Sequence, residues 1–114
     1  TGMARGVDIW AAEIVLKLRD AGQDVKLICA CPFEGCERKW EPNWQRRYRD
    51  ILAQADLVKY ICGGYRPSCF QIRNEWMVSP AARVIAVYSG TKGGTRNTID
   101  DARRSGVPVV IIQG

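Results

Sequence analysis

The sequence predicts an α/β protein with three layers, in which helices cover both faces of a mostly parallel sheet. Two observations lead to this prediction. Segments with the apolar spacing of helices alternate along the chain with short strands rich in Val and Ile. Short breaks that contain Gly and Pro separate these segments. Such alternation is typical of βαβ units, whose crossover helices pack on the two faces of a parallel sheet.

The first predicted helix covers residues 8–22, where Trp10, Ile14 and Leu18 recur every fourth residue. This spacing places the three side chains on one apolar face of the helix. The first predicted strand covers residues 25–30, which are mostly apolar. The pair forms the first helix–strand step of the alternation.

A polar loop that contains two prolines is expected over residues 31–43. Asn43 can cap a second helix, since its side-chain oxygen can accept a hydrogen bond from the first turn. The apolar residues of this helix fall on one face and are Trp44, Tyr48, Ile51, Leu52 and Ala55. A short strand over residues 57–62 follows.

The second half of the chain repeats the alternation. Ser68 is expected to cap a third helix that ends near Met77. Residues 83–88 form the next predicted strand, residues 95–106 the last helix, and residues 108–113 the last strand. In sheets of this kind, ligands bind at the carboxyl ends of the strands, so the loops at that edge are the places to look for a site.

Composition limits the classes of function. The chain has 114 residues, enough for a single domain, and we assign residues 1–114 to one. Its net charge of +5 favours anionic partners, and its lack of His excludes His-based catalysis. No apolar stretch is long enough to cross a membrane. The start has neither the pattern of a signal peptide nor an initiator Met, so we expect a fragment.

The cysteines point to a reducing environment. Their number, five, is odd, and no secretory signal accompanies them, so a cytoplasmic location is expected. Cys29, Cys31 and Cys36 are close in sequence, but their spacing is not that of a zinc site. We therefore expect no metal and no cofactor.

The loop "YSGTKGGTRNT", residues 88–98, lies between a predicted strand and a predicted helix. Its glycines allow a ligand to approach the backbone closely, and the helix that follows presents unpaired N–H groups and the positive end of its dipole. Hydroxyl groups of Ser89, Thr91 and Thr95 add hydrogen-bond donors. The loop lacks the lysine ending of a Walker loop. A tight turn with Thr95 as the helix cap is the competing interpretation.

The loop "TGMARGVD", residues 1–8, shows the same arrangement at the other end of the chain. Gly2 and Gly6 flank a tight bend, and a helix begins near Asp8. The simpler role for Asp8 is to cap that helix or to lie at its positive end. Two such loops support ligand binding better than one does.

Arg73 is the third candidate feature. On the helix "CFQIRNEWMV" it lies on the same side as Phe70 and Met77, where a charge is costly unless it is paired. The side chain can extend to solvent, or it can clamp a phosphate or carboxylate, with the amide of Asn74 as support.

These segments together resemble the SLOG superfamily. The similarity rests on "TGMARGVDIWAAE", "CPFEGCERKW", "RYRDILAQAD", "CFQIRNEWMV" and "IAVYSGTKGGTRNTIDDARRSG", in this order, and spans nearly the whole chain. The most similar branch is that of the YpsA/YoqJ-like proteins. The resemblance implies a Rossmann-like fold and an association with nucleotides or nucleotide-derived ligands. Such folds usually have a strand and a helix before the first glycine loop.

The enzymes of the superfamily provide a test of catalysis. Lonely Guy phosphoribohydrolases carry an Arg on the helix before the glycine-rich strand, which Arg73 matches, and a PGGxGTxxE loop. Gly94 and Thr95 match its GT, but Thr98 occupies the position of its Glu. Thr cannot act as the carboxylate that stabilises an oxocarbenium-like ribosyl centre. We therefore favour binding over hydrolysis and assign no catalytic residue.

The leading interpretation is a domain that binds a nucleotide or a nucleotide-derived phosphate ligand in a Rossmann-like cleft, for signalling or sensing. The expected ligand-binding residues lie on the two glycine loops and on the helix of Arg73. They are Gly2, Met3, Gly6, Asp8, Arg73, Asn74, Ser89, Gly90, Gly93, Gly94, Thr95 and Thr98. The expected partner is this small molecule, with a homodimer left open and no membrane involved.

Two other functions stay open. One is an N-glycoside hydrolase acting on a nucleotide, with its carboxylate relocated to Asp8 or Glu75. The other is single-stranded nucleic-acid binding through residues 38–49, which interleave aromatic and basic side chains. The simpler interpretation of residues 38–49, which we favour, is an amphipathic helix whose aromatic residues face the core.

Overall fold

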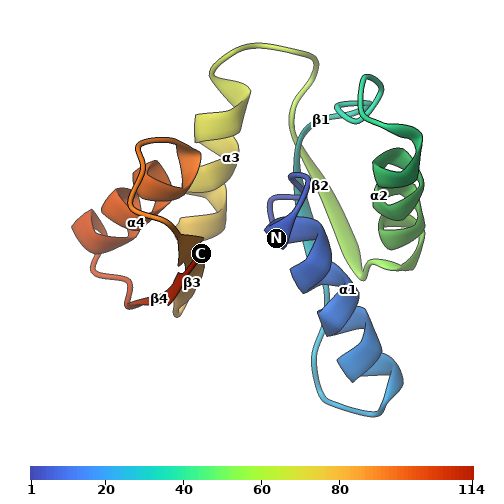
Figure 1. The fold of residues 1–114 in the computed structure, drawn as a ribbon, viewed down its shortest axis with the longest axis horizontal. Coiled ribbons are helices and arrows are strands. Elements are labelled where there is room, and N and C mark those ends of the chain that lie inside the picture. Colours follow the sequence, from blue (N-terminus) through green and yellow to red (C-terminus); the bar gives the residue numbers. More distant parts are fainter. The chain divides into compact units, whose positions relative to one another are not determined.

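The structure is a computed structural model that describes all residues from 1 to 114 (Figure 1). The chain divides into two compact units, Thr1–Arg66 and Pro67–Gly114. The elements, in chain order, are α1 (Val7–Asp20), β1 (Ile28–Phe33), α2 (Pro42–Gln54), β2 (Leu57–Cys62), α3 (Cys69–Val78), β3 (Val84–Tyr88), α4 (Gly94–Arg104) and β4 (Val109–Gln113). The predicted alternation of helices and strands is confirmed.

The strands pair in parallel within each unit. In the first unit β1 pairs with β2, from Ile28 opposite Leu57 to Phe33 opposite Cys62. In the second unit β3 pairs with β4, from Val84 opposite Val109. Parallel strands joined through a helix confirm the α/β class and are consistent with a Rossmann-like fold.

The core of the first unit lies on one face of β1. Cys29 and Cys31 are fully buried there, together with Tyr48 and Ile51 of α2. Cys29 and Cys31 share this face because successive side chains of a strand point to opposite faces. The predicted apolar face of α2 is confirmed, since Trp44, Leu52 and Ala55 pack against the same core.

Helix α1 differs from the prediction in the face that it buries. Ile9, Ala12 and Leu16 are the buried residues of α1. Trp10, Ile14 and Leu18, predicted as one apolar face, are instead 50%, 57% and 44% exposed. The helix carries two adjacent apolar rows, and periodicity alone cannot decide which of them meets the sheet.

Two element boundaries also differ. Strand β1 begins three residues later than predicted, at Ile28, where its ladder with β2 starts opposite Leu57, and it continues to Phe33. Helix α2 has Glu41 at its N-cap and Pro42 in its first turn, so Asn43 is not the cap. Proline suits this position because its missing N–H group would have no partner in the helix.

Thr1 extends the sheet at the second edge of β1. Its amino group donates a hydrogen bond to the carbonyl of Ile28 (3.1 Å), and the N–H of Ala30 donates to the carbonyl of Thr1 (2.9 Å). This is the pattern of a parallel bridge opposite Cys29. The glycine loop that follows Thr1 therefore starts beside β1.

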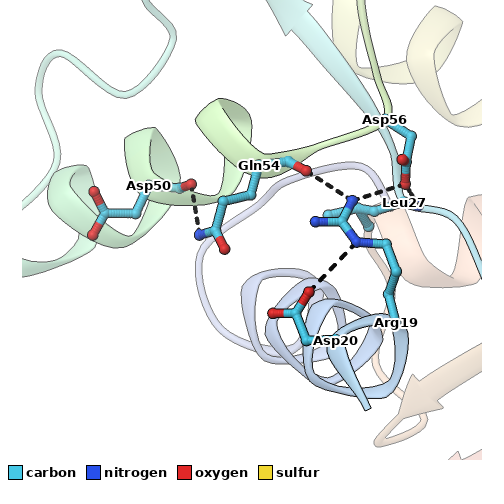
Figure 2. Close-up of polar contacts among 6 residues, drawn as sticks. All are labelled: Arg19, Asp20, Leu27, Asp50, Gln54 and Asp56. Atoms are coloured by element: carbon cyan, nitrogen blue, oxygen red, sulfur yellow. Dashed lines mark hydrogen bonds and ion pairs between the residues drawn. The ribbon is translucent and has the colours of Figure 1, made fainter. Parts of the chain in front are cut away.

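A polar network joins the ends of the helices to the sheet in the first unit (Figure 2). The Nη1 atom of Arg19 donates to the carbonyl of Gln54 (2.9 Å) and to Oδ2 of Asp56 (3.0 Å). The same carboxylate oxygen accepts a hydrogen bond from the backbone N–H of Leu27 (2.7 Å). The hydrogen bond from Leu27, together with Arg19, lowers the pKa of Asp56 below its ordinary value. Asp56 thus fixes the start of β2 against the segment that leads into β1.

We expect the substitution Asp56→Asn to lower the melting temperature at neutral pH by several degrees. A depressed pKa in the folded state means that the carboxylate stabilises the fold fully above the ordinary pKa of 3.8. This stabilisation disappears as the pH falls through the lower pKa that Asp56 has in the folded state. The melting temperatures of wild type and Asp56→Asn should therefore converge in acid, as followed by circular dichroism.

Asp20 provides the matched control for this experiment. Its carboxylate lies 3.8 Å from Nε of Arg19 and its side chain is 67% exposed, so Asp20→Asn should change the melting temperature little. A deficit of Asp56→Asn that persists unchanged in acid would show that the charge of Asp56 has no part in the network.

Candidate ligand-binding site

Helix α4 opens at an unusual glycine. Its N-cap is Gly93, with φ 152° and ψ −164°, a backbone conformation that essentially only glycine adopts. No side chain caps the helix, so Thr95, the cap in the competing interpretation, lies within the first turn instead. The first N–H groups of a helix have no acceptor within the helix, and they carry the positive end of its dipole. Backbone N–H groups that can donate hydrogen bonds to a ligand therefore lie at the start of α4.

Residues with hydroxyl groups lie in the loop before α4 and in its first turns. The hydroxyls of Ser89 and Thr91 are hydrogen-bonded to each other at 3.3 Å. Gly90, between them, has φ 95°, in the region that favours glycine. The hydroxyl of Thr98 donates to the carbonyl of Gly94 (3.0 Å), so its proton is already used within the helix. Among these groups, Ser89 and Thr91 are the better placed to meet a ligand.

Helix α3 contributes two polar side chains near the start of α4, those of Arg73 and Asn74. Asn74 is 6% exposed, and its Nδ2 atom lies 3.8 Å from the point where a Cβ at Gly94 would stand. Its Oδ1 atom accepts a hydrogen bond from Nε of Arg73 (3.0 Å). The guanidinium of Arg73 lies 5.8 Å from the ring centre of Phe70. Arg73 and Asn74 are thus hydrogen-bonded to each other, and Asn74 lies next to Gly94, the first residue of α4.

The glycine loop of the first unit has a firm internal structure. Gly6 is the N-cap of α1 with φ 90°, so Asp8 is not the cap. Asp8 instead accepts a hydrogen bond from the N–H of Ala4 (3.2 Å) with Oδ2, and its carbonyl accepts one from the hydroxyl of Thr1 (3.0 Å). Met3 is 1% exposed and has φ 57°, the chain's one positive φ outside glycine. Such an outlier marks a loop whose conformation its surroundings enforce.

Arg5 is a residue of this region that the sequence patterns did not reveal. Its guanidinium forms an ion pair with Glu41 (2.8 Å) and lies 5.2 Å from the ring centre of Trp40. These contacts tie the first glycine loop to the segment that precedes α2. Because the partners are far apart in sequence, no spacing rule could have indicated them.

The predicted ligand-binding residues fall into two groups, one in each unit. Gly2, Met3, Gly6 and Asp8 lie in the first unit, and Arg73, Asn74, Ser89, Gly90, Gly93, Gly94, Thr95 and Thr98 lie in the second. The first group lies at the start of α1. In the second group most residues lie in the loop before α4 or in its first turns, whereas Arg73 and Asn74 lie on α3, with Asn74 next to Gly94.

The aromatic residues of the basic segment 38–49 pack inside the first unit. Tyr48 is 1% exposed, and its ring meets that of Trp40 edge to face at 5.3 Å. Trp44 packs against the core, and Arg47 covers its ring at 4.7 Å. This is the amphipathic helix that the sequence favoured, and it leaves few aromatic faces on which nucleic-acid bases could stack.

None of the helices combines the length and apolar character that a membrane span requires.

The fold and these helix starts define an α/β protein of Rossmann-like type in which glycine opens helices at both ends of the chain. The family model for the YspA SLOG family matches residues 1–105, so the chain belongs to the SLOG family. Membership in this family suggests a nucleotide-related function.

The chain is also similar to bacterial proteins whose names state no activity. It is 33% identical over 117 residues to the uncharacterized SPbeta prophage-derived protein YoqJ of Bacillus subtilis, covering 92% of this chain and 68% of YoqJ. It is 33% identical over 92 residues to a UPF0398 protein of Halalkalibacterium halodurans, covering 79% of this chain and 49% of that protein. A UPF0398 protein of Bacillus cereus is 31% identical over 104 residues, with coverage of 89% and 56%. The chain thus spans about half the length of the UPF0398 proteins that it matches.

Proposed function

We propose that the chain binds a nucleotide or a nucleotide-derived phosphate ligand, with a phosphate group at the start of α4. The observation that carries this proposal is the glycine-led helix without a side-chain cap, whose backbone N–H groups suit an anion. Arg73 and Asn74 beside Gly94 add side-chain donors. The net charge of +5 favours the approach of an anion.

The first glycine loop is the second part of the proposal. Gly6 opens α1 without a side-chain cap, as Gly93 opens α4. Asp8 and the strained Met3 hold this loop in one shape before any ligand arrives. A preformed loop lowers the entropy cost of binding. We propose Gly2, Met3, Gly6 and Asp8 as a ligand-contacting segment of the first unit.

Hydrolysis of an N-glycosidic bond has less support than binding. Thr98, at the position of the Lonely Guy glutamate, offers no carboxylate. The nearby carboxylates of α4 are engaged with arginines, Asp100 with Arg96 (3.9 Å) and Asp101 with Arg104 (3.6 Å). The carboxylate of Asp8 is engaged with the N–H of Ala4. We therefore propose a binding domain rather than a phosphoribohydrolase.

A thermal-shift screen tests the binding proposal. We expect a nucleotide or a pyrophosphate to raise the melting temperature, because a ligand at 100 times its Kd stabilises a fold by about 2.7 kcal/mol. The matched nucleosides, which lack phosphate, serve as controls and should have a much smaller effect. Absence of stabilisation by every phosphate compound at millimolar concentration would contradict the proposal. Stabilisation by single-stranded DNA that falls steeply with salt would favour nucleic-acid binding instead.

A further inference from the structure

Two cysteine thiols of the first unit share one hydroxyl group. The Sγ atom of Cys36 lies 3.4 Å from the phenolic oxygen of Tyr48, and the thiol of Cys31 is hydrogen-bonded to the same oxygen. Cys31 belongs to β1, and Cys36 lies in the loop that follows. A turn closed by the hydrogen bond from the N–H of Cys36 to the carbonyl of Phe33 (3.3 Å) folds this loop back over the strand end. Both thiols therefore lie next to the same phenolic oxygen, at the edge of the core to which Cys31 and Tyr48 belong.

The two thiols differ in their access to solvent. Cys31 is fully buried, whereas Cys36 is partly exposed. Burial, with the hydrogen bonds to the two thiols, raises the pKa of Tyr48, so its hydroxyl stays neutral. Cys29, the third free thiol of this segment, is buried two residues earlier on β1, and desolvation raises its pKa to about 11. An external reagent would therefore meet Cys36 first.

We propose that Cys31 and Cys36 form a reversible intramolecular disulfide. The thiolate of Cys36 attacks a low-molecular-weight disulfide such as oxidised glutathione, which forms a mixed disulfide and releases one thiol. The thiolate of Cys31 then attacks the sulfur of Cys36 and releases the second thiol. The two cysteines are oxidised by two electrons, the reagent is reduced to two thiols, and the protons of the cysteines pass to the released thiolates. A dithiol reverses the reaction.

The disulfide would change the segment that contacts the first glycine loop. A disulfide sulfur carries no hydrogen, so the donation from the Cys36 thiol to the hydroxyl of Tyr48 would be lost on oxidation, and the Cys31 thiol could no longer donate either. The ring of Tyr48 packs against Trp40, and Trp40 lies beneath Arg5 of the glycine loop. Oxidation at Cys36 therefore acts on residues in direct contact with that loop, which makes the cysteine pair a redox-sensitive device.

Peptide mass spectrometry tests this proposal without any ligand. The full chain is incubated in oxidised glutathione, alkylated and digested with trypsin. Cleavage after Lys26 and Arg38 gives the peptide 27–38, which contains Cys29, Cys31 and Cys36. Formation of the disulfide removes two hydrogens, about 2 Da, and leaves one alkylated cysteine instead of three, so the alkylated peptide should be lighter by these two hydrogens and by two alkyl groups.

The variants separate the possible pairs. Cys29→Ser should keep the loss of mass, and both Cys31→Ser and Cys36→Ser should abolish it. Because Cys36 is partly exposed, Cys36→Ser should fold even if the buried substitution at Cys31 does not. The proposal is overturned if the wild-type peptide accumulates only a mixed disulfide with glutathione. It is equally overturned if Cys36→Ser still shows the loss, since Cys29 and Cys31 would then be the pair.

Discussion

Replacement of Arg73 by Ala is expected to weaken binding of the phosphate ligand roughly 10- to 150-fold. A hydrogen bond to a charged group contributes about 1.5–3 kcal/mol, and each 1.4 kcal/mol is a factor of ten in affinity. Arg73 is held by Asn74, whose amide also adjoins Gly94, so its charge belongs to the surroundings of the α4 start. Isothermal titration with the best ligand of the thermal screen measures the effect.

The substitution Arg73→Lys refines this test. An ammonium group keeps the charge but cannot reproduce the planar fork of a guanidinium, so Lys should restore only part of the lost affinity. The melting temperature without ligand should change little in either variant. If Arg73→Ala lowers the melting temperature sharply and leaves the affinity intact, Arg73 has a structural role. The site would then have to be drawn around the glycine loops alone.

The sequence was most informative where local chemistry decides the structure. Strand β2 has the predicted bounds, and α3 begins directly after Ser68 as predicted. The bounds of β2 follow from a short apolar run with clear breaks on both sides. The start of α3 lies where the sequence placed it, although the side chain of Ser68 makes no capping hydrogen bond. The apolar face of α2 could also be read from its sequence, because it is a single row opposite basic residues.

The sequence was less informative where distant segments decide. The face of α1 that becomes buried depends on the sheet and on α2, where Arg47 forms an ion pair with Glu13 of α1. The bounds of β1 depend on its ladder with β2. Arg5 meets Trp40 and Glu41 across a long stretch of chain. None of these contacts leaves a period or a spacing in the sequence.

The same distinction applies to the candidate site. Glycine-rich loops before helices indicated both helix starts, because glycine is the residue that such tight turns require. The local amide support of Arg73 by Asn74 could also be foreseen from adjacent positions. The caps were harder to predict, since Gly6 and Gly93 occupy the cap positions that Asp8 and Thr95 could fill by propensity. Where the backbone at the cap position has a conformation that only glycine adopts readily, the preference of Asp or Thr for cap positions does not apply.

The backbone conformation of Gly93 leads to the second large expected effect. At φ 152° and ψ −164°, a residue with a Cβ atom is strained by about 1–3 kcal/mol. If the ligand binds to the N–H groups of α4 only when residue 93 has this backbone conformation, the backbone of the Gly93→Ala variant must adopt the strained conformation on binding. The strain energy is then lost from the binding free energy. We expect the affinity for the phosphate ligand to fall roughly 5- to 140-fold, at 1.4 kcal/mol for each factor of ten.

Gly94→Ala is the matched comparison for Gly93→Ala, because Gly94 is also among the predicted ligand-binding residues but has a helical backbone. Gly94 is helical, and an added Cβ would meet Nδ2 of Asn74 at 3.8 Å, an ordinary contact on the side of α3. Ala also favours helical backbone over Gly, so this variant should be at least as stable as the wild type. The two neighbouring substitutions add the same methyl group and differ in the backbone conformation that must accept it. Titration of both with the same nucleotide should therefore show a large loss of affinity for Gly93→Ala and a small one for Gly94→Ala. Equal affinities would mean that the phosphate is not held by the backbone at the start of α4.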